Sequence, residues 1–290
     1  MQPIPESELI FNADGSIYHL NLHPEQLADT VLTVGDPGRV ARISKYFDKI
    51  ETRSEKREFV THTGWLGQQR LTVLSTGIGT ENIDIVMNEL DALVNIDFKT
   101  RLPKTEHKAL KIIRVGTSGA VWADAPVDAL VASAFGIGLG NLMHFYEYAY
   151  TETEREILDA LSRFAPFPTA IQPQVFAGDA GLLEALQLDL QGITLTAPGF
   201  YAPQGRQLRA VTKFSSENLH RLNNFQYKNW HITNFEMETA AIFGLAKILG
   251  HRAASCNVLI ANRISKQFSS DPAAAVEKLI RAVLEKVTSL

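Results

Sequence analysis

Short apolar runs alternate with longer amphipathic stretches along the chain. Runs rich in β-branched residues are typical of strands, and we expect strands at residues 30–34, 71–75, 111–115, 129–134 and 253–260. The stretches between them carry helical periodicity. This alternation predicts an α/β fold in which helices cover a sheet.

The clearest helix is the last one in the chain. Ser270-Asp271-Pro272 forms a helix start signal, and the apolar residues that follow recur at helical spacing on one face. Charged residues occupy the remaining faces, so we expect a surface helix packed against the sheet. The apolar positions are Val276, Leu279, Ile280, Val283, Leu284 and Val287.

A second helix is predicted over residues 236–249, ending at Gly250. It is apolar on nearly all sides, which indicates a buried helix. It nevertheless begins with Glu236-Met237-Glu238. Buried carboxylates are costly unless they are paired or bound to a ligand, so these two acids are candidate site residues. The alternative is that they are ordinary helix-start carboxylates, which the helix dipole favours.

Glycine-bearing turns are predicted after three of the strands. Glycines at the carboxyl end of a strand let backbone N–H groups approach an anion, and an arginine such as Arg39 can grip it with two donors. Turns also need glycine for steric reasons, so each turn alone fits both interpretations. Together they are expected at the sheet edge where α/β proteins bind ligands. The turns are Gly35-Asp36-Pro37-Gly38-Arg39, Ser75-Thr76-Gly77-Ile78-Gly79-Thr80 and Gly116-Thr117-Ser118-Gly119.

Nucleotide cofactors and a required metal are not indicated. No glycine turn is followed by the Gly-Lys-Ser/Thr of a phosphate loop, and residues 136–140 lack the dinucleotide-binding spacing. His19 and His23 have helical spacing, but Pro24 follows at once and no carboxylate completes a metal triad.

Composition narrows the class of protein. The chain has 290 residues, 45% of them hydrophobic, and a net charge of -4, which argues against a nucleic-acid partner. No apolar run approaches the roughly 20 residues of a membrane helix, and the start lacks a leader pattern. We therefore expect a cytoplasmic protein with no membrane partner. No repeat or linker divides the chain, so residues 1–290 are predicted to form a single domain.

The single cysteine, Cys256, excludes an intrachain disulfide. It lies in an apolar predicted strand, where a buried structural thiol is expected and a reactive thiol is the alternative.

Four motifs together carry a family resemblance. They are Gly-Asp-Pro-Gly-Arg at 35–39, Ser-Thr-Gly-Ile-Gly at 75–79, Arg-Val-Gly-Thr-Ser-Gly at 114–119 and Glu-Met-Glu at 236–238. In this order they resemble the uridine phosphorylase family. The resemblance implies a three-layer αβα phosphorylase/hydrolase-like fold with a central mixed sheet. It also implies a pentosyltransferase of pyrimidine salvage, which uses inorganic phosphate to convert uridine, with thymidine or deoxyuridine as further substrates, to the base and ribose 1-phosphate. No organic cofactor is implied.

The implied phosphate site consists of Gly35, Arg39, Arg57, Arg114 and Thr117. Rigid guanidinium groups suit a multiply charged anion because each can bind an oxyanion through two donors. Arg57 is implied to reach the phosphate in a neighbouring subunit's site. A homo-oligomer with active sites shared between subunits is therefore expected.

The implied ribose site consists of His19, Glu236, Met237 and Glu238. Glu238 would accept the ribose hydroxyls, Met237 would pack on the sugar, and His19 of a partner subunit would lie at the 5′-hydroxyl. Cleavage builds oxocarbenium-like positive charge on the ribose, and a nearby carboxylate stabilises that charge in the transition state.

The implied base site consists of Ser118, Gly119, Phe200, Gln204 and Arg206. Gln204 would satisfy N3–H and one carbonyl of uracil, while Arg206 would donate to the other oxygen. Negative charge grows on the departing base, so Arg206 counts as catalytic together with Arg114 and Glu238. Phe200 is suited to pack against the base plane.

Some positions depart from the family pattern. Purine-directed relatives typically use an aspartate where this chain has Asn262, which favours a pyrimidine substrate. Some relatives bind a monovalent cation such as K+ between subunits; Glu58 and Ile78 fit that site, but Asn82 stands where a serine is usual. Residues 97–108 and 141–154 form longer excursions than in the compact bacterial forms, so dimer and hexamer both stay open.

The alternatives are a purine nucleoside phosphorylase, a nucleosidase of the same fold and a catalytically silent nucleoside-binding protein. The arginines at 39, 57 and 114 argue against a nucleosidase, because attack by water does not need such a cluster of positive charge.

Overall fold

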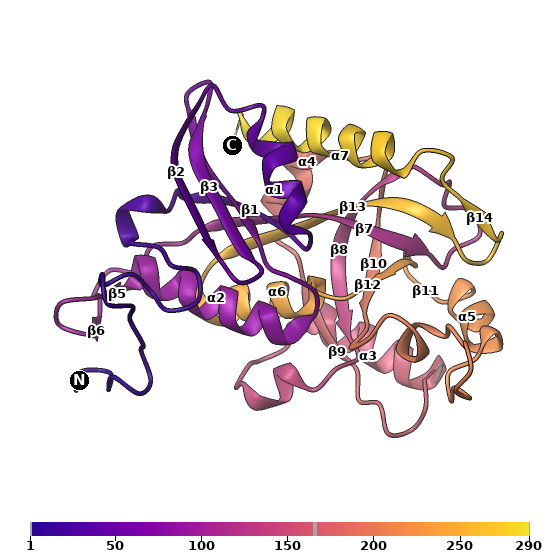
Figure 1. The fold of residues 1–290 in the computed structure, drawn as a ribbon. Helices are drawn as coiled ribbons and strands as arrows, with labels where there is room; N and C mark the ends of the chain where they lie inside the picture. Colours follow the sequence, from indigo (N-terminus) through magenta and orange to yellow (C-terminus); the bar gives the residue numbers. More distant parts are fainter. Residues whose placement is uncertain (1, 165–166, 290) are drawn as a thin grey trace. The chain divides into compact units, whose positions relative to one another are not determined.

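Strands and helices alternate along the chain as predicted in the computed structural model, which describes residues 2–164 and 167–289 (Figure 1). The expected α/β class, with a central mixed sheet and helices around it, is confirmed. The internal contacts divide the chain into two compact units. Unit 1 comprises residues 1–113 and 245–252, and unit 2 comprises residues 114–244 and 253–290. The single domain over 1–290 stays a prediction.

Unit 1 is built on strands in the order β1-β4-β3-β2. Strands β1 and β4 are parallel, with Val34 opposite Ser75, while β3 and β2 run antiparallel to their neighbours. The glycine turns after β1 and β4 therefore leave the same edge of the sheet. The elements are η1 (Pro24–Gln26), β1 (Thr30–Val34), α1 (Pro37–Ser44), β2 (Lys49–Lys56), β3 (Phe59–Leu66), β4 (Gln69–Ser75), α2 (Thr80–Asn95), β5 (Ile96–Asp97) and β6 (Leu102–Pro103).

Three elements pass from one unit into the other. They are β7 (Lys111–Ala120), α6 (Thr239–Leu249) and β13 (Arg252–Asn262), of which only the first residue belongs to unit 1.

Unit 2 contains the remaining elements, together with β13 from residue 253 onward. They are β8 (Leu130–Gly138), η2 (Leu142–Phe145), α3 (Glu152–Phe164), β9 (Gln174–Ala177), α4 (Ala180–Leu186), β10 (Leu190–Thr196), η3 (Ala202–Gln204), α5 (Ser216–Asn223), β11 (Gln226–Tyr227), β12 (Trp230–Glu236), β13 (Arg252–Asn262), β14 (Gln267–Phe268) and α7 (Pro272–Val287).

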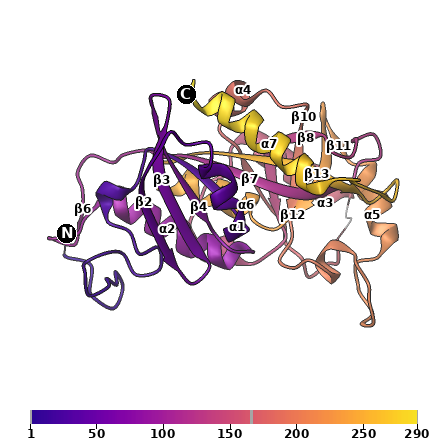
Figure 2. The ribbon, with the colours of Figure 1, turned by 45° about the horizontal axis from the view of Figure 1, so that its top comes forward.

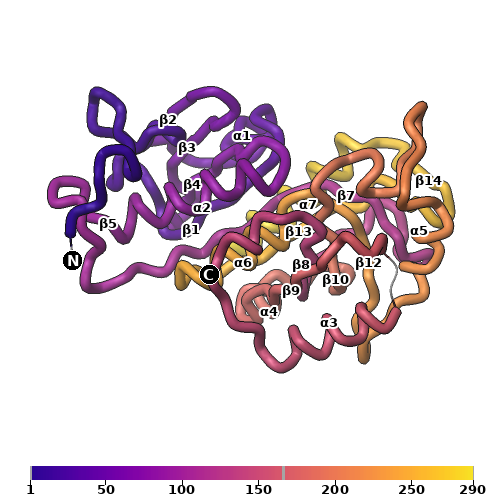
Figure 3. The backbone as a smooth tube through the Cα atoms, turned by 90° about the horizontal axis from the view of Figure 1, so that it is seen from below, coloured from indigo at the N-terminus to yellow at the C-terminus, as the bar shows by residue number. Residues whose placement is uncertain are grey.

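The strands of unit 2 form a closed ring. They follow the order β12-β10-β8-β13-β7, and β12 pairs with β7 as well. Strand β10 is parallel to both β8 and β12, whereas β13 is antiparallel to β8 and β12 is antiparallel to β7. Helix α7 lies beside α4 (Figure 2), and α3 packs on β9 (Figure 3).

The predicted last helix is confirmed as α7. Asp271 caps its start by accepting a hydrogen bond from the Ala274 amide at 3.0 Å, and Pro272 occupies the first turn. All of the predicted apolar positions are buried. None of the helices in the described part of the chain has the length and apolar character needed to cross a membrane.

Two local predictions were wrong. Residues 116–119 are not a turn but part of β7, because Gly119 pairs with Phe235 of β12 and continues the ladder. Helix α6 is buried as expected over 239–246, but it begins at Thr239 rather than Glu236. Glu236 ends β12, and its carboxylate accepts hydrogen bonds from the Glu238 and Thr239 amides at 2.9 Å, so it caps the helix from the strand.

Cys256 is fully buried in β13, as predicted for a structural thiol. Burial raises its pKa to about 12, so the thiolate form is disfavoured in the folded protein.

Candidate functional site

Strands β7 and β12 position most of the candidate residues of unit 2. β7 carries Arg114, Thr117, Ser118 and Gly119 in sequence, and β12 ends at Glu236 just before Met237 and Glu238. The two strands pair antiparallel, with Asn234 opposite Ala120. Residues far apart in the chain are therefore brought together by the closed ring of strands.

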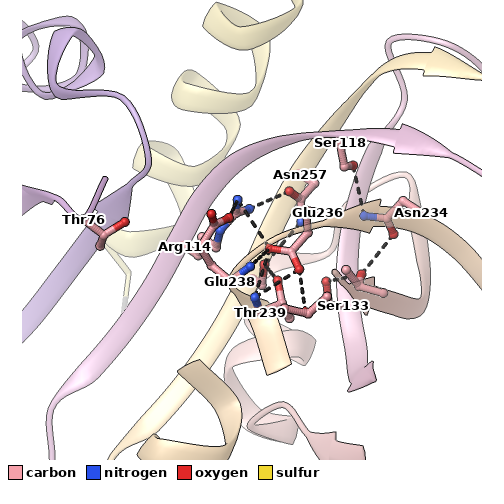
Figure 4. Close-up of polar contacts among 12 residues, drawn as sticks. Thr76, Arg114, Ser118, Ser133, Asn234, Glu236, Glu238, Thr239 and Asn257 are labelled. Carbon is pink, nitrogen blue, oxygen red and sulfur yellow. Dashed lines mark hydrogen bonds and ion pairs between the residues drawn. The ribbon is translucent and has the colours of Figure 1, made fainter. Parts of the chain in front are cut away.

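A buried cluster of charge lies at Arg114 (Figure 4). Arg114 is 6% exposed, Glu236 4% and Glu238 3%. The Nη2 of Arg114 donates to Oε2 of Glu238 and lies 3.4 Å from Oε2 of Glu236. Burial tends to lower the pKa of Arg114, but the Glu238 and Glu236 carboxylates raise it above its ordinary value. Arg114 thus carries a stable positive charge against two acids.

Glu236 and Glu238 differ in their surroundings. Glu236 accepts a hydrogen bond from Thr196 Oγ1 at 2.6 Å as well as those from the backbone amides of the following turn. Burial raises the pKa of Glu236, Arg114 opposes this shift and Glu238 adds to it. The contacts of Glu236 anchor the turn, which places Glu238 beside Arg114.

Asn257 of β13 also contacts Arg114, and sequence reasoning missed it. Its Oδ1 accepts a hydrogen bond from Nη1 of Arg114 at 2.7 Å, and its side chain is fully buried. No local motif marks this residue, because it lies in a strand that is mostly apolar and outside every turn or charged cluster that the sequence offers.

The predicted base-site residues Phe200, Gln204 and Arg206 are brought together around η3. Arg206 Nη1 donates to the Phe200 carbonyl at 2.7 Å and to Gln204 Oε1 at 2.6 Å. The guanidinium carbon lies 3.9 Å from the centre of the Phe200 ring. Gln204 is buried, while Phe200 is 51% exposed. Burial lowers the pKa of Arg206.

A second arginine, Arg263, joins this group and was not predicted. Its Nη1 donates to the Gln204 carbonyl, and a side chain at Gly119 would meet Cδ of Arg263 at 3.4 Å and Nη2 of Arg206 at 3.9 Å. Burial and the charge of Arg206 lower the pKa of Arg263 to about 10. Gly119 therefore lies in contact range of the side chains of both arginines.

Asn262, which stands where purine-directed relatives typically have an acid, has structural contacts. Its Nδ2 donates to the Trp122 carbonyl at 2.9 Å and to the Ala125 carbonyl at 2.8 Å. Its Oδ1 accepts from the Ile264 and Ser265 amides at 3.0 Å. This side chain therefore holds the turn after β13.

Ser118 is oriented by a buried chain of polar groups. Its Oγ accepts a hydrogen bond from Asn234 Nδ2 at 3.0 Å (Figure 4). Asn234 Oδ1 in turn accepts from Thr194 at 3.0 Å and from Thr233 at 2.7 Å. Because Asn234 uses its amide nitrogen on Ser118, the hydroxyl proton of Ser118 is left to donate elsewhere.

In unit 1, the turns after β1 and β4 lie side by side. The Gly77 carbonyl would be 3.5 Å from a side chain at Gly35, and Gly77 and Gly79 have φ angles of 72° and 100° that favour glycine. Asp36 accepts from the Gly38 amide at 2.9 Å and caps α1, which contains the half-buried Arg39. Gly35 and Arg39 stay predicted phosphate ligands.

His19 is held firmly within unit 1. Its Nδ1 lies 2.6 Å from Glu89 Oε1, and the same carboxylate accepts from the His19 amide at 3.0 Å. The exposed Arg57 has a φ angle of 55°, and its guanidinium lies 5.8 Å from the Tyr18 ring centre.

The three residues predicted for a monovalent cation surround the turn at Gly77. A side chain at Gly77 would lie 2.4 Å from Asn82 Nδ2 and 3.1 Å from Cγ of Glu58, and Ile78 is 70% exposed. A K+ ion at Glu58, Ile78 and Asn82 stays a prediction.

Comparisons with known proteins agree with the resemblance. A family model described as the Phosphorylase superfamily matches residues 29–289. The uridine phosphorylase of Thermococcus kodakarensis is 29% identical over 257 residues, which cover 88% of this chain and 80% of that protein. A DeoD-type purine nucleoside phosphorylase of Tolumonas auensis is 26% identical over 263 residues, which cover 87% of this chain and 90% of that protein.

The fold comparison points the same way. A solved structure of a Trypanosoma brucei nucleoside phosphorylase, described as showing uridine phosphorylase activity, matches with a TM-score of 0.90 at 29% identity. The match covers 98% of this chain and 100% of the Trypanosoma brucei chain. The expected phosphorylase-like fold is thereby confirmed.

Proposed function

This chain belongs to the phosphorylase superfamily, and we propose that it is a nucleoside phosphorylase that uses inorganic phosphate to split uridine into uracil and ribose 1-phosphate. The observation that carries the proposal is the buried pair of Arg114 and Glu238 on neighbouring segments of unit 2. Burying two charged side chains costs desolvation free energy even when they pair with each other. A site that binds an anion and a sugar would use both charges, and perturbed buried charges are typical of functional sites.

In the proposed reaction, Glu238 acts on the ribose. Its carboxylate accepts the sugar hydroxyls and stabilises the positive charge that builds on the ring as the glycosidic bond breaks. Arg114 and Thr117 are the proposed phosphate ligands in unit 2. Because phosphate is itself the nucleophile, the protein contributes chiefly by positioning it and by electrostatic stabilisation.

The side chains around η3 support a pyrimidine dione as the base. The edge of uracil presents a carbonyl, an N–H and a second carbonyl in a row. Gln204 Oε1 faces Arg206. In the proposed complex the amide oxygen of Gln204 accepts from N3–H, and its amide nitrogen donates to one carbonyl of uracil. Arg206 donates to the other carbonyl. Phe200 offers its ring to the plane of the base.

A purine substrate is the second candidate, since DeoD-type purine nucleoside phosphorylases are among the relatives at comparable identity. Asn262 counts against it, because its amide is engaged with backbone groups and supplies no acid to protonate a purine.

The direct test is release of free base from uridine, thymidine, inosine and adenosine, each with and without phosphate, followed by ultraviolet absorbance. We expect cleavage of uridine that depends on phosphate. Cleavage without phosphate would identify a nucleosidase, and preference for inosine or adenosine would move the assignment to the purine enzymes. No cleavage of any of the four would contradict the proposed activity and favour a binding protein.

We further propose a homo-oligomer in which Arg57 completes the site of a neighbouring subunit. Arg39→Ala and Arg57→Ala should each abolish most of the activity. When the two variants are co-expressed, random pairing of subunits should restore about one quarter of the wild-type rate, because hybrid sites combine an intact Arg39 with an intact Arg57. Absence of any recovery in purified hybrid oligomers would argue against shared sites.

A further inference from the structure

The guanidinium of Arg114 is held at both of its terminal nitrogens. Nη2 contacts the carboxylates of Glu238 and Glu236, whereas Nη1 donates to the neutral amide of Asn257 at 2.7 Å. An arginine beside carboxylates commonly closes a bidentate pair, with two parallel N–H···O bonds to one acid. Here Asn257 engages Nη1, the nitrogen that would complete an end-on pair of Nη1 and Nη2 with Glu238.

The backbone of β7 provides the space for this arrangement. Arg114 and Gly116 are two residues apart on a strand, so they face the same side of the sheet. A side chain at Gly116 would lie 1.8 Å from Nη1 of Arg114 and 2.8 Å from Oδ1 of Asn257. The guanidinium therefore occupies the space that the missing side chain leaves, and Asn257 of the neighbouring strand β13 contacts it there.

The orientation of the Asn257 amide follows from its other contact. Nδ2 donates to Ser255 Oγ at 3.2 Å, and Ser255 Oγ lies 2.8 Å from Thr239 Oγ1. All three side chains are fully buried, and the Thr239 amide donates to Glu236. A flipped amide would turn its NH2 group toward the guanidinium, so the network fixes Oδ1 as the acceptor for Arg114.

We propose that Asn257 is a positioning residue for phosphate binding. By retaining Nη1, it prevents Arg114 from closing an end-on bidentate pair with Glu238 and keeps the guanidinium oriented for an incoming oxyanion. This inference rests on the proposed function, because it takes Arg114 as a phosphate ligand. It assigns to Asn257 a role that is exerted through Arg114.

The test is binding of inorganic phosphate alone, measured by equilibrium dialysis with radiolabelled phosphate on the full-length protein. Asn257→Ala should raise the Kd for phosphate about tenfold, since a hydrogen bond that orients a charged group is lost. Asn257→Asp, which has nearly the same shape, should weaken binding further because it places another negative charge against Arg114. If the alanine variant does not fold, the aspartate variant carries the test.

Asn95→Ala is the matched control. Asn95 is also a buried asparagine, and its Nδ2 donates to Asp91 at 2.6 Å and to the Lys108 carbonyl at 3.2 Å in unit 1. It should lower the free energy of unfolding without changing the Kd for phosphate. A purely structural role of Asn257 would give the same pattern as this control.

The outcomes separate the two proposals. Wild-type affinity for phosphate in a folded Asn257→Ala variant would overturn the positioning role while leaving the proposed function intact. Equal weakening in the Asn257 and Asn95 variants would also overturn it, as a general loss of stability. Failure of the wild-type protein to bind phosphate would overturn the proposed function and, with it, this inference.

Discussion

Replacing Glu238 by glutamine should lower kcat for uridine phosphorolysis by roughly 10²- to 10³-fold, the range found when a group that stabilises transition-state charge is removed. The substitution preserves the shape of the side chain and removes its negative charge. In the proposed reaction that charge acts mainly on the positive ribose of the transition state, so kcat should fall much more than KM for uridine rises. Steady-state kinetics with saturating phosphate measures both quantities.

A matched control is available elsewhere in unit 2. Glu154 in α3 is 1% exposed and accepts hydrogen bonds from the Thr151 amide at 2.6 Å and the Ala177 amide at 2.9 Å. Glu154→Gln removes a carboxylate that is as deeply buried as that of Glu238 but has no proposed role in the reaction. It should cost stability and leave kcat unchanged. If Glu238→Gln behaves in the same way, Glu238 is not the group that stabilises the ribose.

Helical periodicity and strand composition were sufficient to predict much of the fold. In α7, the start signal and the apolar face lie within one continuous segment, so local sequence contains all the information that the prediction needs. The boundaries that failed depend on distant partners. Gly116 and Gly119 look like turn residues in isolation, but both lie within β7, and at Gly119 the strand pairs with Phe235 of β12.

The candidate site shows the same division. The motif around Arg114 and the pair of acids after β12 could be singled out from sequence, because charged residues next to buried segments are unusual. Their partnership could not be derived from spacing, since Arg114 and Glu238 are separated by 124 residues and Arg114 and Asn257 by 143. Only the closed ring of strands brings these side chains into contact.

Arg263 illustrates a further limit. In the sequence, Arg263 looks like an ordinary charged residue after a strand, and the family resemblance singles out its neighbour Asn262 instead. Its place beside Arg206 arises from the fold of the chain around η3, where its Nη1 meets the Gln204 carbonyl. Contacts to backbone carbonyls leave no residue-type signal, so such a position cannot be recognised from one sequence.

Replacing Arg206 by alanine should reduce kcat/KM for uridine by roughly 10²-fold or more. The Arg206 guanidinium donates to Gln204 Oε1 at 2.6 Å and lies over the Phe200 ring. Its loss would remove the proposed donor to the base and release the amide that is proposed to bind the base. The measurement is initial-rate kinetics at saturating phosphate. Arg209→Ala, which removes an exposed arginine of the same loop, should leave the rate unchanged.

The leaving group distinguishes a catalytic role of Arg206 from a role in binding alone. If its positive charge stabilises the negative charge on the departing base, the loss caused by Arg206→Ala should be smaller for 5-fluorouridine, because fluorine already makes the departing base a weaker base. A role limited to orienting the base predicts the same loss for both nucleosides. An Arg206→Ala variant with wild-type kcat/KM for uridine would contradict both roles. Arg263 would then be the best candidate in unit 2 for stabilising the base, because its guanidinium contacts the Gln204 carbonyl beside Arg206.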